Sequence, residues 1–206
     1  MLIFFTSAIA HADTNWVLKK DLDGIKVYTG DMPGSKLKIV RVTCTLNARL
    51  SQLASLLLDI PAHEQWVYNT KTSYVVKQLA EGHLIYYSEI SMPNPLGNRD
   101  VVVDLHITQQ PATKVMSVIA NAIEQYVPVK KDKVRITLSK VSWTVTPIGK
   151  DQISIEYTAQ ADPGGSLPAW TVNLFTTKGP FETFKKLKEL IASPIYQNAH
   201  IDFIKD

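Results

Sequence analysis

Apolar and polar residues alternate with a period of two along most of the chain, and this alternation is typical of strands with one face in a core. The run 36–46 shows it most clearly, because Leu, Ile and Val alternate there with Lys, Arg and Thr. The same pattern, or short apolar runs between turn residues, predicts further strands at 16–20, 25–28, 73–79, 83–91, 100–109, 114–121, 134–147 and 151–161. A short connection around Gly149 joins the last two in the manner of a hairpin.

The spacing of apolar residues changes to that of helices in two parts of the chain. In the segment 50–58 leucines recur at helical spacing, and Pro61 ends this helix before a second short one at 63–67. A long amphipathic helix is predicted at 168–191, and residues 193–206 are interpreted as a C-terminal tail. This order predicts an α+β fold, in which a curved antiparallel sheet wraps around the C-terminal helix and a short helix pair follows the third strand. Such a sheet encloses a cavity unless large side chains fill it.

The composition agrees with one folded domain and argues against several classes of function. The chain has 206 residues, of which 45% are hydrophobic, and its net charge of +3 comes from basic residues scattered along the sequence. A nucleic-acid partner is therefore not expected, whereas a weak attraction to anionic lipid head groups is permitted. Cys44 is the only cysteine, so no disulfide forms within this chain. The histidines lack metal-site spacing and no nucleophile-elbow or phosphate-loop motif occurs, so neither a metal nor a cofactor is expected.

The first twelve residues differ from the rest of the chain. An apolar run leads to Ala10-His11-Ala12, and signal peptidase accepts this ending because its pocket admits only small side chains at two positions. We therefore expect a signal peptide at 1–12, cleavage after Ala12, and a protein secreted to a bacterial periplasm or a similar compartment. The segment lacks the basic residues with which signal peptides start, so we expect the true start to lie upstream. The alternative is a merely hydrophobic amino terminus, because a triplet of small residues arises easily by chance.

Three parts of the sequence resemble a known family. Segment 91–102 (SMPNPLGNRDVV) resembles the part of START domains that ends in Arg-Asp and opens a central strand. Segment 162–173 (DPGGSLPAWTVN) resembles the family's entry into its last helix, and the helix pair that ends near Trp66 matches a third feature. START domains are lipid-transfer domains related to the steroidogenic acute regulatory protein, and they belong to the helix-grip, Bet v 1-like superfamily. The resemblance implies that residues 13–192 form one START-like lipid-binding domain.

The resemblance also implies a cavity in which a few polar side chains orient a ligand. Arg99 stands at the rim of the otherwise apolar face formed by alternate residues of 99–107, and Tyr87 and Glu89 lie on the preceding strand. We expect Arg99, Glu89 and Tyr87 to bind the polar part of a ligand. The alternative for Arg99 is a local ion pair that pins its turn. The family's usual cavity arginine is replaced by Leu105, so the family's cholesterol specificity is not carried over.

The aromatic residues Trp66, Trp170 and Phe175 are expected to line or close the mouth of this cavity. Gly179 and Pro180 interrupt the long helix, and a proline inside a helix costs ~3 kcal/mol because it removes a backbone hydrogen bond and clashes with the preceding turn. In START domains this helix lies over the cavity mouth like a lid. The expected kink is then either the hinge of that lid or a static bend that follows the curved sheet.

These features predict that the protein binds a lipid or another hydrophobic small molecule and carries it between membranes. The expected partners are a lipid or sterol-like ligand and, transiently, a membrane surface, and the protein is expected to be a monomer. One alternative is a cyclase- or hydrolase-like enzyme that uses the same cavity, which would need converging His, Arg and Asp or Glu side chains. Another is a non-transfer accessory or sensor protein of the envelope, which would have a filled cavity and an exposed apolar patch. We expect a carrier and not an enzyme.

Overall fold

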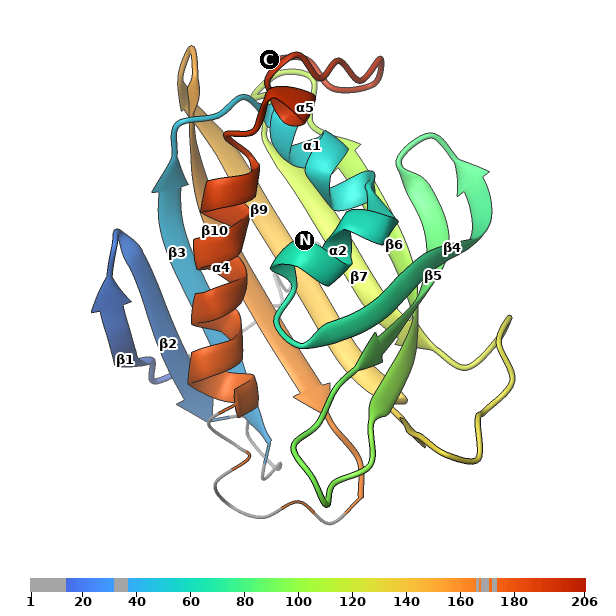
Figure 1. Ribbon diagram of the computed structural model, residues 1–206. Coiled ribbons are helices and arrows are strands. Elements are labelled where there is room, and N and C mark those ends of the chain that lie inside the picture. Colours follow the sequence, from blue (N-terminus) through green and yellow to red (C-terminus); the bar gives the residue numbers. More distant parts are fainter. Residues whose placement is uncertain (1–13, 32–36, 166, 168–170, 172–173) are drawn as a thin grey trace, which may run out of the picture.

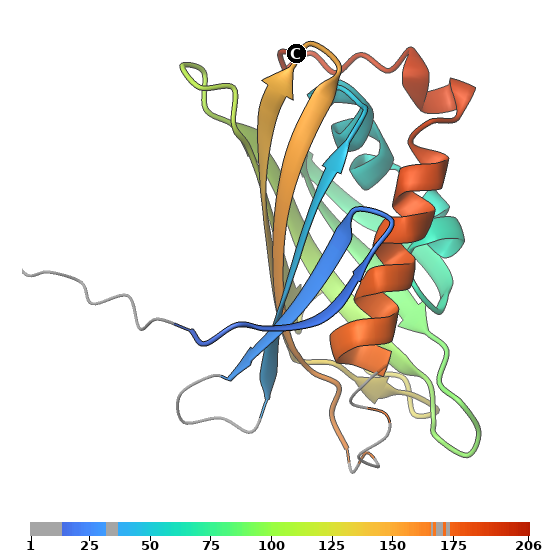
Figure 2. The same ribbon diagram turned by 90° about the vertical axis from the view of Figure 1, so that its left-hand side faces the viewer.

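The structure is a computed structural model that describes residues 14–31, 37–165, 167, 171 and 174–206 (Figure 1). The predicted signal peptide, Trp170 and most of the first part of the predicted terminal helix lie outside the described residues. The described helices all lie on one side of a curved sheet, as Figure 2 shows. None of them is long and apolar enough to cross a membrane.

The described residues form one sheet of ten strands in the order β1-β2-β3-β10-β9-β7-β6-β5-β4, with β8 added beside β6. Every pairing is antiparallel except that of β8 with β6. The strands are β1 (Val17–Leu22), β2 (Ile25–Asp31), β3 (Lys38–Leu46), β4 (Thr70–Ala80), β5 (His83–Ile90), β6 (Arg99–Gln109), β7 (Met116–Ile123), β8 (Val134–Arg135), β9 (Leu138–Gly149) and β10 (Gln152–Asp162). Because β3 pairs with β10, the first three strands join the seven that follow the helix pair.

Each predicted strand overlaps an observed one, with one difference. The run 134–147, predicted as a single strand, is divided into β8 and β9. The chain first follows the start of β6, where the N–H of Val134 and the N–H of Ile136 donate to carbonyls of Asn98 and Asp100. It then pairs with β7 as β9. A change of partner within an apolar run leaves no trace in a two-residue periodicity.

The helices are α1 (Leu50–Leu58), the short η1 (Ile60–Ala62), α2 (His63–Trp66), the π-helical turn η2 (Leu174–Lys178), α4 (Gly179–Leu190) and α5 (Pro194–Gln197). The first three form the predicted helix pair between β3 and β4. The observed α+β helix-grip architecture confirms the predicted fold class.

The terminal helix differs from the prediction where Pro180 lies. Pro180 occupies the first turn of α4, where a missing N–H costs no α-helical hydrogen bond. The π-helical turn η2 precedes it directly, and π-turns are rare segments that interrupt regular helices. Residues 174–190 are therefore two segments that meet at Gly179, and Pro180 does not kink the middle of a regular α-helix.

The core lies between the concave face of the sheet and the helices. Phe181, Phe184 and Leu187 of α4 are buried against it, and in Figure 1 this helix crosses in front of the strands. They meet buried side chains such as Val27 and Val42 from β2 and β3. Burial of an apolar side chain of this size contributes about 1.5–3 kcal/mol, so α4 is held to the sheet mainly by this stripe.

The segment predicted to be a tail is packed onto the fold. Tyr196 of α5 is buried and its hydroxyl donates to Asp59 at 2.8 Å. The carboxylate of Asp206 accepts hydrogen bonds from the backbone N–H of Ser51 at 2.9 Å and from Arg49 at 2.7 Å. A carboxylate at the first turn of a helix stabilises α1, because the unpaired N–H groups and the helix dipole favour negative charge there.

Candidate functional site: a cavity between the sheet and α4

A cavity of about 300 Å³ lies between the concave face of the sheet and the helices. The sheet contributes alternate residues from successive strands, because alternate side chains of a strand point to the same face. These residues are Lys38 and Val40 of β3, Tyr86, Ser88 and Ile90 of β5, Val101, Val103 and Leu105 of β6, Val118 and Ala120 of β7, Ser139, Val141 and Trp143 of β9, and Tyr157, Ala159 and Ala161 of β10.

The helices close the other side of the cavity. His63 and Trp66 of α2 and Phe184 of α4 contribute to this wall. The backbone N–H of Tyr68, just after α2, donates to the Oγ1 of Thr183 in α4 at 3.0 Å. This hydrogen bond joins the two helical segments across one edge of the cavity.

Two groups of aromatic rings form part of the cavity wall. Trp143 stacks on Phe184 with ring centroids 5.1 Å apart, and Tyr157 meets both rings edge-on at 5.0 and 5.3 Å. His63 meets Trp66 and Tyr86 edge-on at 5.0 and 5.4 Å. Such edge and stacked contacts hold the rings in fixed positions, so this part of the wall has a defined shape.

The described wall carries little charge. Lys38 and His63 are its only residues with a basic side chain, and no Asp, Glu or Arg belongs to it. Lys38 stands at the start of β3 with a side chain that is 43% exposed and pairs with Asp31. Burial lowers the pKa of His63 to about 4, so that its ring is neutral at pH 7. Its Nε2 lies 3.0 Å from the carbonyl oxygen of Leu57, and because a carbonyl can only accept, Nε2 carries the proton.

The structure places four of the predicted site residues in the cavity wall. Trp66, Phe175, Gly179 and Pro180 all line it, and Trp66 is only 3% exposed. Ligand contact by the two aromatic residues, and a hinge at Gly179 and Pro180, stay predictions. Trp170 lies outside the described residues.

Arg99 does not line the cavity, although it is in register with the inward-facing residues Val101, Val103 and Leu105 of β6. Its guanidinium donates to the carbonyl oxygens of Gly97, Pro163 and Gly164 at 2.5, 3.2 and 3.2 Å. Among the described residues no carboxylate pairs with it, so the alternative of a local ion pair is not what the structure shows either. Arg99 instead ties the β5–β6 connection to the segment after β10, which corrects its assignment to the ligand site. Burial lowers the pKa of Arg99, but a guanidinium of such high pKa remains charged.

Glu89 and Tyr87 lie on the outer face of β5, away from the cavity. Glu89 accepts from Asn98 at 2.8 Å and pairs with Lys71 and Lys133 at 3.1 and 3.4 Å. Burial alone would raise the pKa of Glu89, but these hydrogen bonds lower it, so it is a carboxylate at neutral pH. Tyr87 packs with Ile85 and Val102, stacks on Tyr74 at 5.0 Å and lies under the ammonium group of Lys130. The prediction that Glu89 and Tyr87 line the cavity is therefore wrong. Both faces of β5 are buried, and the cavity is lined by the other face, which carries Tyr86 and Ser88.

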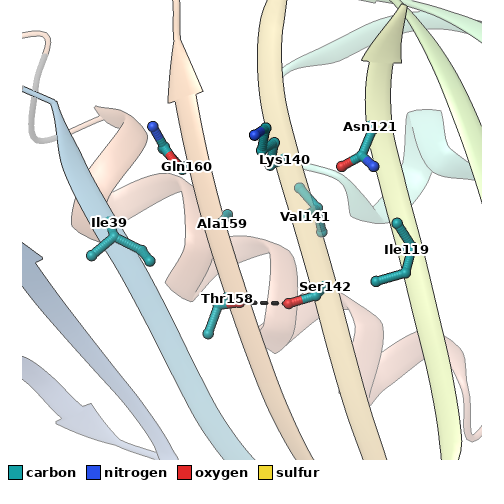
Figure 3. Close-up of a pocket in the computed structure, with 9 residues that line it drawn as sticks. All are labelled: Ile39, Ile119, Asn121, Lys140, Val141, Ser142, Thr158, Ala159 and Gln160. Atoms are coloured by element: carbon teal, nitrogen blue, oxygen red, sulfur yellow. Dashed lines mark hydrogen bonds between the residues drawn. The ribbon is translucent and has the colours of Figure 1, made fainter. Parts of the chain in front are cut away.

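A second hollow of about 250 Å³ lies on the outer face of the sheet (Figure 3). Asn121, Lys140 and Gln160 contribute polar groups to it, and the hydroxyls of Ser142 and Thr158 hydrogen-bond to each other at 2.7 Å. These polar groups suit it poorly to the apolar body of a lipid. In the described part of the chain, no group of three or more His, Cys, Asp or Glu side chains is arranged to hold a metal ion.

A curved antiparallel sheet that grips a terminal helix around a mainly apolar cavity defines the helix-grip fold. The family model of the START domain matches residues 5–193, and the chain belongs to that family, as the sequence motifs predicted.

Three individual proteins illustrate this relationship. The chain is 31% identical over 175 residues to an uncharacterized protein of Pseudomonas aeruginosa, covering 84% of this chain and 85% of that protein. It is 27% identical over 201 residues to the phosphatidylcholine transfer protein of Rattus norvegicus, covering 94% and 88% of the two chains. The crystal structure of a STAR-related lipid transfer protein from Xanthomonas axonopodis superposes with a TM-score of 0.79 at 32% identity, covering 86% of this chain and 99% of that one.

Proposed function

We propose that this protein binds a lipid in the cavity beneath α4 and carries it between membranes. The observation that carries the proposal is the cavity between the sheet and the helices, whose wall is mainly apolar and holds a few neutral polar groups. Membership of the START family and the similarity to proteins named for lipid transfer support it.

Apolar burial supplies the binding energy in this proposal. Each methylene group moved out of water contributes about 0.8 kcal/mol, so that a lipid tail is held well in the cavity. A bilayer offers the same tail a similar gain. Movement between membrane and cavity is therefore nearly balanced in free energy, and the polar groups of the wall set which lipid is preferred.

Entry of a lipid requires the helical side of the cavity to open. The hydrogen bond between the N–H of Tyr68 and Thr183 is one contact that has to break, and Gly179 lies close to the ring of Tyr68. We propose that α4 acts as the lid and that Gly179 and Pro180, where η2 meets α4, form its hinge. The net charge of +3 favours transient docking on an anionic membrane surface.

The enzyme alternative finds less support in the wall of the cavity. A cavity enzyme needs an acid, a base and a stabilising cation that converge, whereas the described wall holds neutral His63 and the exposed Lys38 without an Asp, Glu or Arg. The alternative of a non-transfer accessory or sensor protein requires an interior filled by side chains. The cavity of about 300 Å³ argues against such an interior. Secretion to a periplasm after cleavage at Ala12, and a monomeric state, remain part of the proposal.

The test is to purify the protein from its native host and identify co-purifying molecules by native and denaturing mass spectrometry. A lipid in one-to-one ratio supports the proposal and names the ligand class. The purified protein should then move that lipid from donor to acceptor vesicles. A protein that binds no lipid in either assay contradicts the carrier function, and a chemically altered ligand favours the enzyme.

A further inference from the structure

Two tyrosines face the cavity from opposite parts of the sheet. Tyr86 belongs to β5 and Tyr157 to β10, and β6, β7 and β9 lie between these strands in the sheet. The ring of Tyr86 is held edge-on by His63, and that of Tyr157 by Trp143 and Phe184. Both phenols therefore have fixed positions in the cavity wall.

The hydroxyls of these two tyrosines have no hydrogen-bond partner among the residues that the structure describes. By contrast, the hydroxyl of Tyr196 donates to a carboxylate of Asp59. Burial raises the pKa of Tyr86 and of Tyr157, and the charge of a Tyr86 phenolate would raise the pKa of Tyr157 further, so both phenols stay protonated at neutral pH. A ligand that fills the cavity separates these hydroxyls from water. Because a hydroxyl buried without a hydrogen-bond partner is costly, a ligand that supplies that partner is favoured.

The charge of the cavity wall decides which kind of ligand group can hydrogen-bond to these two hydroxyls. An ionised group inside the cavity would find no compensating charge, because His63 is neutral and the described wall holds no arginine. Lys38 is paired with Asp31 at the exposed start of β3, and the guanidinium of Arg99 is occupied by three carbonyl oxygens. Hydroxyl and ester groups, in contrast, need only hydrogen bonds.

We propose that the cavity selects lipids whose buried polar group is an uncharged oxygen group, such as a hydroxyl or an ester carbonyl, and that Tyr86 and Tyr157 hydrogen-bond to this group. This inference rests on the proposed function and specifies its ligand class. A cavity of about 300 Å³ lies at the low end of small-molecule sites, so single-chain amphiphiles are the appropriate probes.

The test compares probes that share one alkyl chain and differ in the head group: dodecanol, methyl dodecanoate, dodecanoate and dodecane. The delipidated full chain is titrated at pH 7.5, and binding is followed by the fluorescence of Trp66 and Trp143, which line the cavity. We expect dodecanol and methyl dodecanoate to bind at least roughly tenfold more tightly than ionised dodecanoate, because only the latter carries an uncompensated charge into the cavity.

A double variant, Tyr86→Phe with Tyr157→Phe, tests the two residues. We expect its affinity for dodecanol to fall roughly three- to thirtyfold, as the loss of one or two hydrogen bonds implies, and its affinity for dodecane to stay unchanged. Tyr74→Phe on the outer face, where Tyr74 is 42% exposed, is the matched control and should bind as the wild type does.

Equal affinity for dodecanol and dodecanoate, or a double variant with wild-type affinity for dodecanol, would overturn the inference and leave the proposed function intact. Failure of the wild type to bind any of the four probes would overturn both. A thermal melt of each variant verifies that it is folded, and the unchanged binding of dodecane verifies that its cavity is intact.

Discussion

Two adjacent residues, Arg99 and Asp100, hold two different loops because successive side chains of a strand point to opposite faces. Arg99 binds carbonyl groups of the segment after β10 on the inner side. Asp100, fully buried on the outer side, accepts from Nε and Nη2 of Arg135 at 2.9 and 3.0 Å. Arg135 in turn donates to the carbonyls of Val127 and Pro128. The Arg-Asp motif that gave the family resemblance therefore has a structural role in this chain.

Removal of one partner from the buried pair should be strongly destabilising. Asp100→Asn leaves the guanidinium of Arg135 buried without its counter-charge, and we expect the free energy of unfolding to fall by about 3 kcal/mol. Urea denaturation at pH 7 measures this loss. Asp21→Asn is the control, because Asp21 forms an ion pair with Lys26 in which both side chains are about half exposed, and a change of less than about 0.5 kcal/mol is expected there. Equal losses in the two variants would contradict the structural role of Asp100.

His63 should make the stability depend on pH. Its pKa is about 4 in the folded protein and 6.5 when unperturbed, so between these values the unfolded state binds a proton that the folded state does not. The contribution of the neutral His63 ring to the free energy of unfolding is fully present above pH 6.5. It is lost as the pH falls towards 4, and the total loss is about 3 kcal/mol. We expect His63→Gln to flatten this part of the pH profile measured by urea denaturation. His200→Gln, at a side chain that is 76% exposed, should leave it unchanged.

The tyrosines of β5 show how far residue-level prediction reaches. Alternation separates Tyr86 and Ser88 from Tyr87 and Glu89, but it does not say which pair faces the cavity. One face of β5 packs on the core and cavity, and the other is covered by Val76, Ile123 and Val127, so both faces are buried. Only the pairing of β5 with β6, which places Tyr86 opposite Val103, decides between them, and this register is a tertiary property.

At the scale of elements, local patterns predicted most of the fold. The sequence predicts a helix at 50–58, the bounds that α1 has, because a periodic run of leucines ends before a proline. The terminal helix was predicted less well, since an apolar stripe continues across η2 and α4 and does not reveal a π-helical turn. The packing of 193–206 was missed because its contacts, such as Asp206 with α1, join residues about 150 positions apart in the sequence.

Gly179 is the position where η2 and α4 meet, and a side chain there has no room. An added Cβ would overlap the carbonyl oxygen of Leu174 and lie 3.2 Å from the ring of Tyr68. We expect Gly179→Ala to lower the free energy of unfolding by about 1–3 kcal/mol, as overpacking does elsewhere, and to lower the melting temperature measured by circular dichroism. At Gly97 an added Cβ meets nothing within 4 Å, so Gly97→Ala is the control and should melt close to the wild type. Wild-type stability of Gly179→Ala would show that the junction repacks freely.

At the scale of the whole molecule, a hollow lies on each face of the curved sheet, and the inner one has the more apolar wall. Adjacent residues of β7 distinguish them, because Ala120 lines the inner cavity and Ile119 the outer hollow. A ligand that binds the folded state raises stability by RT ln(1 + [L]/Kd), which is about 2.7 kcal/mol at a hundredfold excess over Kd. Thermal melts with and without lipid therefore report which hollow is used when each hollow is filled in turn by a substitution.

We expect Ala120→Phe to fold, because its larger ring projects into free space of about 300 Å³, and to lose both lipid binding and the lipid-induced rise in melting temperature. Ile119→Phe, at a site that is 43% exposed on the outer face, should keep both. The reverse pattern would place the lipid in the outer hollow and contradict the proposed carrier mechanism. Because the two substitutions lie side by side on one strand and introduce the same side chain, a difference between them reports on the face of the sheet and not on the strand itself.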